Sequence, residues 1–221
     1  MQNYRLQLSS SPTEEVRSGM LFLRKDQAVQ LLQLCRERIA TAPTQGRKSQ
    51  RLKQLLMIRY FMLNGLSPME LSNARIEHLD PMEGTLFLPR RHWKKDCLTD
   101  IDEETVKLQI IYSGSRKKGP LVRSRNTRGH IQPKSFCRLV KLVAVHTTIP
   151  NAERITPLIL KRTFARLYIK TPGNTIAGLQ KQFSHRHLWS TAHYLKFVLD
   201  DVKIEHNRMV RRIEERTVEN R

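Results

Sequence analysis

Acidic residues are scarce in this chain of 221 residues and are absent from a long stretch of it. Forty Lys and Arg oppose twenty Asp and Glu, for a formal net charge of +20. No acid occurs between Thr105 and Ala152, where ten bases lie: Lys107, Arg116, Lys117, Lys118, Arg123, Arg125, Arg128, Lys134, Arg138 and Lys141. Such an excess repels itself unless a polyanion or solvent compensates it. Nucleic acid is therefore the leading expected partner, and an anionic membrane surface or an acidic protein is the alternative.

Cysteines and long apolar runs are also few. Cys35, Cys97 and Cys137 form no C-x-x-C pair and have no histidine at the spacing of a zinc site. They favour reduced thiols, and we expect no metal and no cofactor. The N-terminus has no apolar signal core, and no run of 18 apolar residues occurs. We therefore expect a soluble, cytoplasmic protein without a membrane partner.

Hydrophobic periodicity predicts an α+β fold that is mainly helical. Apolar residues at 3.6-residue spacing indicate helices, and short alternating runs between 76 and 101 indicate a small antiparallel sheet. The expected helices span about 26–39, 49–64, 67–75, 102 onward, 133–146, 156–169, 175–183 and 190–199. Asp26 is the expected cap of the first helix, and residues 43–48 are an expected loop. Residues 1–24 are predicted to be an arm or linker, and 201–221 a charged helical tail.

The segment Ser67-Pro-Met-Glu70 has the pattern of a capping box, with proline at the first helical position. A serine in this place stabilises a helix by about 1 kcal/mol. Gly65, just before it, is expected to end the preceding helix, because glycine adopts the left-handed conformation easily.

Three motifs follow one another along the chain. The first begins Asn64-Gly-Leu-Ser-Pro-Met-Glu-Leu, the second is Thr156-Pro-Leu-Ile-Leu-Lys-Arg, and the third runs from Leu179 to Tyr194 with His185 nine residues before the tyrosine. In this order, with a hairpin between the first two, they resemble the catalytic domain of tyrosine recombinases, the phage-integrase family. The resemblance implies this domain for residues 25–200, with double-stranded DNA as the partner.

The resemblance also implies roles for individual residues. The family cleaves DNA with two arginines, a hairpin lysine, two histidines and a tyrosine that attacks the phosphate. By position, Tyr194 is the nucleophile and His185 a phosphate-binding histidine, while Lys94 or Lys95 is the hairpin general acid. Outside the resemblance, an amphipathic helix also places such a tyrosine in a core, and a hairpin tip is ordinarily a solvated surface. Both interpretations stay open at this point.

Three positions depart from the family pattern. Ser67 stands where the family has arginine, Leu158 where it has histidine, and Lys161 where it has the second arginine. Leucine donates nothing to a phosphate, and lysine lacks the two-pronged grip of a guanidinium. Losing one preorganised donor typically lowers a rate by about 10²–10³. Peripheral phosphate contacts contribute separately through counterion release. The sequence therefore predicts DNA binding with weak or no strand transfer.

The expected DNA surface is basic: Arg90, Arg91, Lys94, Lys95, Arg116, Lys117, Lys118, Arg123, Arg125, Arg128 and Arg162. Three functions remain open. The first is a DNA-binding recombinase relative that acts in recombination, integration or its regulation within a mobile genetic element. The second is an active recombinase that forms a phosphotyrosine through Tyr194. The third is a basic RNA-binding or structural protein. Family members carry a further helical domain, so a separate subunit is an expected partner. Exchange of the C-terminal tail between copies is another expectation.

Overall fold

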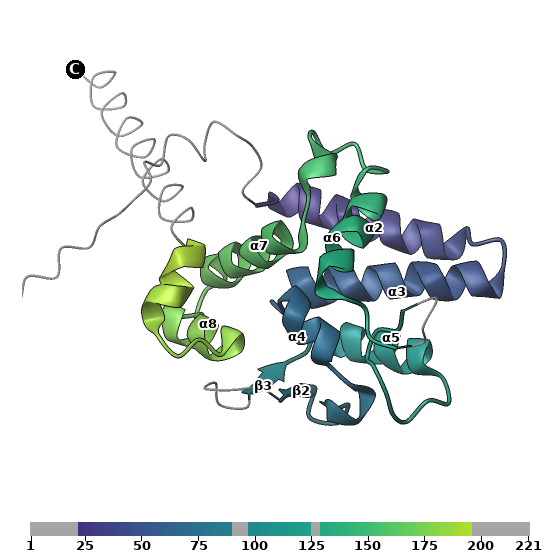
Figure 1. Cartoon of the computed structure of the whole chain (residues 1–221). Coiled ribbons are helices and arrows are strands. Elements are labelled where there is room, and N and C mark those ends of the chain that lie inside the picture. Colours follow the sequence, from purple (N-terminus) through teal and green to yellow (C-terminus); the bar gives the residue numbers. More distant parts are fainter. Residues whose placement is uncertain (1–21, 90–96, 125–128, 196–221) are drawn as a thin grey trace, which may run out of the picture.

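The computed structural model describes residues 22–89, 97–124 and 129–195 (Figure 1). Its helices are α2 (Lys25–Ala40), α3 (Gln45–Met62), α4 (Pro68–Asn73), α5 (Glu103–Ser113), α6 (Pro133–Ala144), α7 (Pro157–Lys170) and α8 (Ile176–Phe183). Two single-turn helices, η1 (Ile76–His78) and η2 (Ala152–Arg154), join them. A further helix begins at residue 188 and is described as far as 195. The predicted α+β, mainly helical architecture is confirmed.

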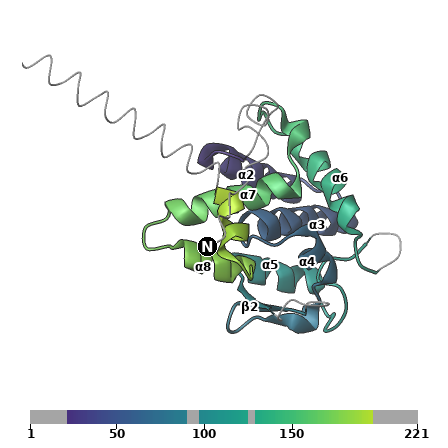
Figure 2. The ribbon, with the colours of Figure 1, turned by 60° about the vertical axis from the view of Figure 1, so that its left-hand side comes forward.

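Helix α3 is the centre of the molecule. It packs against α2 and α7 on one side and against α5 on the other, with α6 crossing it (Figures 1 and 2). The side chains from Leu55 to Met62 are all buried, so this half of α3 is apolar around most of its circumference. A helix of that kind belongs inside a domain rather than on its surface.

The sheet has three short antiparallel strands, β1 (Leu79–Asp80), β2 (Thr85–Leu88) and β3 (Cys97–Asp100), in that spatial order. Leu86 and Leu88 face the core while Phe87 between them is exposed, as the two-residue period of a strand requires. Strand β3 contacts α8, where the Thr99 hydroxyl donates to the carbonyl of Gln182 at 2.9 Å. The sheet therefore supports the C-terminal helices.

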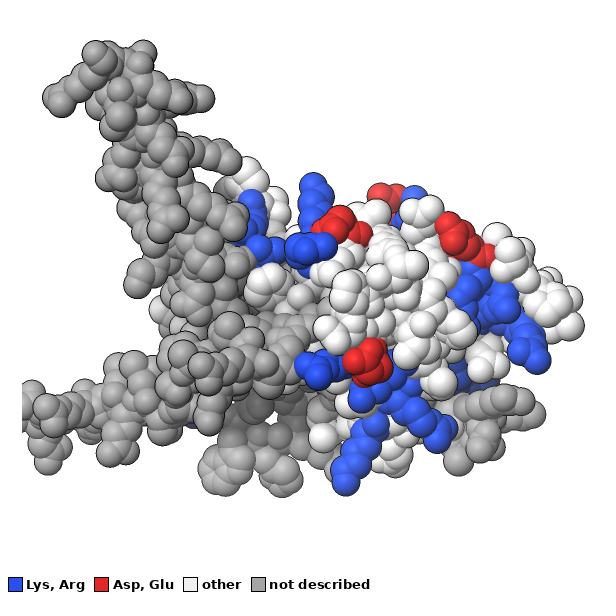
Figure 3. Space-filling model, turned by 90° about the horizontal axis from the view of Figure 1, so that it is seen from above, with Lys and Arg blue, Asp and Glu red and all other residues white. Residues whose placement is uncertain are grey.

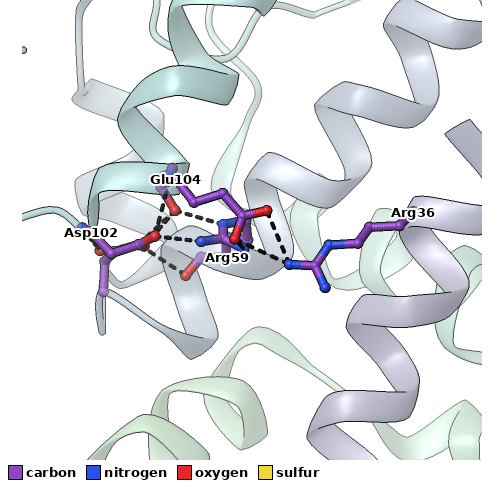
Figure 4. A network of polar contacts seen from close by, with 6 residues as sticks. Arg36, Arg59, Asp102 and Glu104 are labelled. Atoms are coloured by element: carbon purple, nitrogen blue, oxygen red, sulfur yellow. Dashed lines mark hydrogen bonds and ion pairs between the residues drawn. The ribbon is translucent and has the colours of Figure 1, made fainter.

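A buried arginine ties α3 to α5 (Figure 4). The guanidinium of Arg59 donates to Asp102, to Glu104 at 2.9 Å and to the Thr105 hydroxyl at 2.8 Å. Asp102 is also the N-cap of α5, because its side chain accepts from the Thr105 N–H at 3.0 Å. Burial opposes the charge of Asp102, but hydrogen bonds from Thr105 and the charge of Arg59 lower its pKa. Arg59 is thus committed to holding two helices together.

Two predicted boundaries are wrong. Asp26 lies in the first turn of α2 rather than capping it; Arg24 is the N-cap, and its N–H donates to the Gln27 side chain at 2.9 Å. Helix α3 begins at Gln45 within the expected loop, because the Thr44 hydroxyl accepts from the Arg47 N–H at 3.3 Å and starts the helix early. Where both the prediction and the described residues give a boundary, the other helices begin and end within about four residues of the prediction.

Candidate functional site

Ser67 starts α4, as the capping-box pattern predicted. Its hydroxyl accepts from the Glu70 N–H at 3.3 Å, and the Glu70 carboxylate accepts from the Ser67 N–H at 2.7 Å. Both halves of the capping box are therefore formed, and this prediction is confirmed. The position where the resembled family has an arginine is thus occupied by a short side chain whose hydroxyl accepts from the backbone of Glu70.

Gly65 lets the turn before α4 approach the aromatic residues of α7 and α8. Its φ is +70°, and a Cβ there would lie 2.7 Å from ring atoms of both Phe164 and Phe183. A left-handed φ and this lack of space both favour glycine. The close approach places the turn before α4 beside α7 and α8, where the second and third motifs lie.

Lys161 points into the molecule from the first half of α7. Its side chain is 5% exposed, and its ammonium nitrogen lies 3.5 Å from the Glu70 carboxylate. The same nitrogen lies 4.3 Å from the ring centre of Phe183 and 5.7 Å from that of Tyr194. The cation that replaces the second arginine is therefore held by a carboxylate and two aromatic faces.

His185 and Tyr194 lie face to face beside Lys161. Their ring centres are 5.6 Å apart with 27° between the planes, and Phe183 packs against Tyr194 at 5.1 Å. Ser184 adopts a left-handed conformation at the end of α8, which turns the chain so that His185 reaches the tyrosine. The His185 Nδ1 is 3.0 Å from the Thr191 hydroxyl. The structure thus brings Lys161, His185 and Tyr194 into one cluster, as the motif order predicted; their chemical roles stay a prediction.

The Tyr194 phenol is half-buried, and its surroundings raise its pKa. Burial raises its pKa most, the negative charge of Glu70 raises it further, and the positive charge of Arg162 lowers it. A tyrosine nucleophile must lose its proton during attack on phosphorus. The field at Tyr194 therefore opposes the chemistry that its position implies.

Leu158 lies in the first turn of α7 with 47% of its surface exposed. Arg162 follows four residues later and therefore shares its face of the helix. An apolar group cannot donate to a phosphate, so Leu158 supplies no donor where the resembled family has histidine. Arg162 is nevertheless close enough for its charge to lower the pKa of Tyr194.

Trp189 of the third motif lies on the surface, where 72% of its area is exposed. Thr191 and Leu195, four residues apart, occupy the buried face of this helix, and Trp189 stacks on the exposed ring of His187 instead. His193 is also exposed.

Apart from Arg162 on α7, the expected DNA-contacting cations fall into two groups. Those of the hairpin and loop, Arg90, Arg91, Lys94, Lys95, Arg125 and Arg128, lie outside the described residues. Lys117 and Lys118 are exposed, and Arg116 and Arg123 are half-buried in the segment after α5. Arg123 lies beside α3, where the Lys53 ammonium donates to its carbonyl. Figure 3 views the side formed by α2, α6 and α7, where Lys and Arg outnumber Asp and Glu. The ten-base stretch itself is spread over α5, α6 and the loop between them.

Sequence reasoning missed Glu70 as a member of the cluster. Its place in the capping box was the only signal, and that signal concerned helix initiation. The structure adds that the same carboxylate lies 3.5 Å from Lys161 and raises the pKa of Tyr194. Within the described ranges, no group of three or more His, Cys, Asp or Glu side chains is placed to hold a metal ion, and no helix is long and apolar enough to cross a membrane.

Solved structures with a similar fold are DNA recombinases and integrases. XerA recombinase has a TM-score of 0.64 at 19% identity, over 84% of this chain and 64% of that chain. XerH site-specific recombinase bound to difH substrate has a TM-score of 0.62 at 14% identity, over 79% and 50%. The Tn1549 transposon integrase in complex with a circular intermediate DNA has a TM-score of 0.58 at 14% identity, over 80% and 61%.

No family model and no curated protein matches the sequence. The match to these three structures spans between 50% and 64% of their lengths. At identities of 14% to 19% the similarity establishes architecture rather than activity. The described chain therefore has the catalytic-domain fold of the tyrosine recombinases and integrases.

Proposed function

We propose that this chain binds double-stranded DNA with its recombinase fold and acts in DNA recombination or integration, or in its regulation, with weak or no strand transfer. The fold and the DNA present in two of the similar structures support the DNA partner. The net charge of +20 supports it independently, since phosphate contacts supply most of the affinity of such proteins.

The pairing of Lys161 with Glu70 carries the proposal of weak cleavage. In a cleaving enzyme the cations of the pocket stabilise charge that develops on the phosphate. Here Lys161 is buried beside a carboxylate at 3.5 Å, Ser67 is part of a helix cap, and Leu158 is apolar. The cluster therefore keeps the tyrosine but offers the phosphate few donors.

DNA binding is tested by titrating the protein with duplex DNA and duplex RNA at several salt concentrations. We expect the chain to bind duplex DNA more tightly than duplex RNA. The logarithm of its affinity should fall linearly with the logarithm of the salt concentration, with a slope that corresponds to several phosphate contacts. Replacing Lys94 and Lys95 with alanine should weaken binding more than replacing Lys25 and Lys107, which are exposed cations on α2 and α5. Equal affinity for RNA, or binding insensitive to salt, would favour the basic RNA-binding or structural alternative.

An active recombinase is the second candidate, and the stacking of His185 on Tyr194 favours it. In this alternative Tyr194 forms a 3′-phosphotyrosine, with Lys94 or Lys95 as the general acid. The combined change Ser67→Arg, Leu158→His and Lys161→Arg restores the family pattern. We expect it to raise covalent DNA attachment above that of the unaltered chain. If the unaltered chain already attaches efficiently and the changes add nothing, the second candidate replaces the first.

Assembly on DNA is proposed to involve residues 201–221, which lie outside the described residues. Met209, Val210 and Ile213 share one face of the helical pattern, a stripe too narrow to fill a core alone. Deleting the residues after Leu199 should reduce cooperative binding to DNA while changing single-copy affinity by only about a few-fold. Unchanged cooperativity would remove tail exchange from the proposal and leave a separate recombinase subunit as the partner.

A further inference from the structure

An open surface pocket of about 430 Å³, called the cavity below, lies along the first half of α3. Gly46, Ser49, Gln50 and Lys53 line one wall at spacings of three and four residues, so they share one face of α3. Tyr112 from α5 and the segment Arg123–Ser124 line the opposite wall. Lys53 is at the middle of α3, about 15 Å from its C-terminal end at 1.5 Å per residue.

Lys53 is the most buried cation of this cavity. Only 9% of its surface is exposed, and its ammonium nitrogen lies 3.4 Å from the backbone carbonyl of Arg123. An ammonium retains its charge in such a place only if polar partners replace water. The buried Lys53 ammonium in the wall of the cavity therefore indicates a site suited to an anion.

Two arginines add to this charge. The guanidinium of Arg116 lies 5.4 Å from the ring centre of Tyr112, whose hydroxyl accepts from the Arg123 N–H at 3.4 Å. Burial lowers the pKa of Arg116, and the like charge of Arg123 lowers it further. The two guanidinium groups therefore repel each other beside the cavity, and a bound anion would relieve that repulsion.

Acidic side chains are absent from the lining of this cavity. None of the seven described lining residues is Asp or Glu, and none occurs from Thr105 to Ala152. The first turn of α3 also lacks an acid, although acids commonly balance the positive end of a helix. Ser49, Gln50, Tyr112 and Ser124 supply neutral groups that can donate hydrogen bonds.

We propose that this cavity binds a phosphate group, with Lys53 and Arg123 as the charged ligands and the neutral donors completing the set. The site is separate from the Tyr194 cluster, since none of its described lining residues belongs to that cluster. The volume is within the range of small-molecule sites, so the phosphate belongs either to a nucleotide-sized molecule or to the backbone of duplex DNA. Only the DNA source rests on the proposed function.

Inorganic pyrophosphate tests the cavity without DNA. Calorimetric titration should show binding to the unaltered chain, at least tenfold weaker binding to Lys53→Met, and no change in Lys107→Met. Lys107 is an exposed lysine on α5 and is the matched control. If Lys53→Met fails to fold, Arg123→Gln replaces it, because Arg123 is only half-buried.

Titration with duplex DNA then distinguishes the two sources of the phosphate, a nucleotide-sized molecule and the DNA backbone. If the backbone occupies the cavity, Lys53→Met or Arg123→Gln should reduce the logarithmic salt slope of DNA binding by about 0.9, the value for one lost phosphate contact. Pyrophosphate binding that depends on Lys53, with an unchanged slope, assigns the cavity to a small phosphorylated molecule. No pyrophosphate binding together with an unchanged slope overturns the proposal. A chain that binds pyrophosphate through Lys53 but binds no duplex would contradict the proposed function alone.

Discussion

Glu70 connects helix initiation to the chemistry of Tyr194. The carboxylate closes the cap of α4, lies 3.5 Å from the ammonium of Lys161 and raises the pKa of the tyrosine. One side chain therefore both stabilises a helix and opposes ionisation of the candidate nucleophile. Because glutamine can also close a capping box, the two effects can be separated by mutation.

Glu70→Gln should lower the pKa of Tyr194, because it removes a negative charge while leaving the cap formed. Carbon-13 NMR of labelled tyrosine ring carbons, followed with pH, measures this change directly. Burial also raises the pKa of Tyr112, but Glu70 is not among the groups that shift it, so Tyr112 is the internal control. A Tyr194 pKa that stays the same or rises would contradict the effect assigned to the charge of Glu70.

Arg59→Met should lower the free energy of unfolding by about 2 kcal/mol, because it removes the buried donor shared by Asp102, Glu104 and the Thr105 hydroxyl. Urea unfolding measures this loss. Arg36→Met is the matched control: its ion pair with Glu104 is exposed and should contribute at most about 1 kcal/mol. Equal losses in the two variants would show that burial of the Arg59 network does not matter.

The same network predicts a dependence of stability on pH. The pKa of Asp102 is lower in the folded chain than its ordinary value of 3.8. Its contribution to stability is therefore fully present above 3.8 and is lost as the pH falls through the lower folded value. Unfolding free energies measured across this acidic range should fall less steeply in Arg59→Met. An equally steep fall would assign the acid sensitivity to other carboxylates.

Helix boundaries in this chain follow local signals, which is why most were predictable. Ser67, Asp102, Thr156 and Thr175 each cap a helix through the side-chain bond that their residue type suggests. The start of α3 was missed because Thr44 lies in a polar stretch without apolar periodicity. The pairing of Lys161 with Glu70 could not be predicted, since it arises only when α4 and α7 pack together.

The turn at Gly65 is the element that positions the cluster, and Gly65→Ala should destabilise the fold by about 3 kcal/mol. A positive φ costs an L-residue about 1–2 kcal/mol, and displacement of the Phe164 and Phe183 rings adds to this. Gly173→Ala is the matched control, because its φ of +85° is also positive but nothing lies within 4 Å of the added Cβ. Urea unfolding should show a clearly larger loss for Gly65→Ala, and equal losses would contradict the close packing.

Charge is segregated along the whole molecule. Residues 70–104 contain nine of the twenty acids, whereas residues 105–199 contain eighteen Lys and Arg and a single acid, Glu153. The folded chain thus collects cations in α5, α6, α7 and the segments that join them. Such a distribution destabilises the compact state until a polyanion or salt offsets it.

Raising the salt concentration should therefore increase the thermal midpoint of the unliganded chain, because screening weakens the repulsion among these cations. Differential scanning calorimetry in sodium chloride measures the shift. Duplex DNA should raise the midpoint further, since a ligand that binds only the folded chain stabilises it. A midpoint that falls with salt would mean that attractive ion pairs outweigh the repulsion.

A nicked duplex that traps covalent protein–DNA intermediates separates DNA binding from strand cleavage in one sample. The unaltered chain should shift this duplex in a native gel, yet leave little or no covalent product after denaturation. Tyr194→Phe should bind equally well, because the tyrosine is half-buried in the Lys161 and His185 cluster rather than part of the basic surface. Abundant covalent product from the unaltered chain that disappears in Tyr194→Phe would contradict the proposal of weak or no strand transfer.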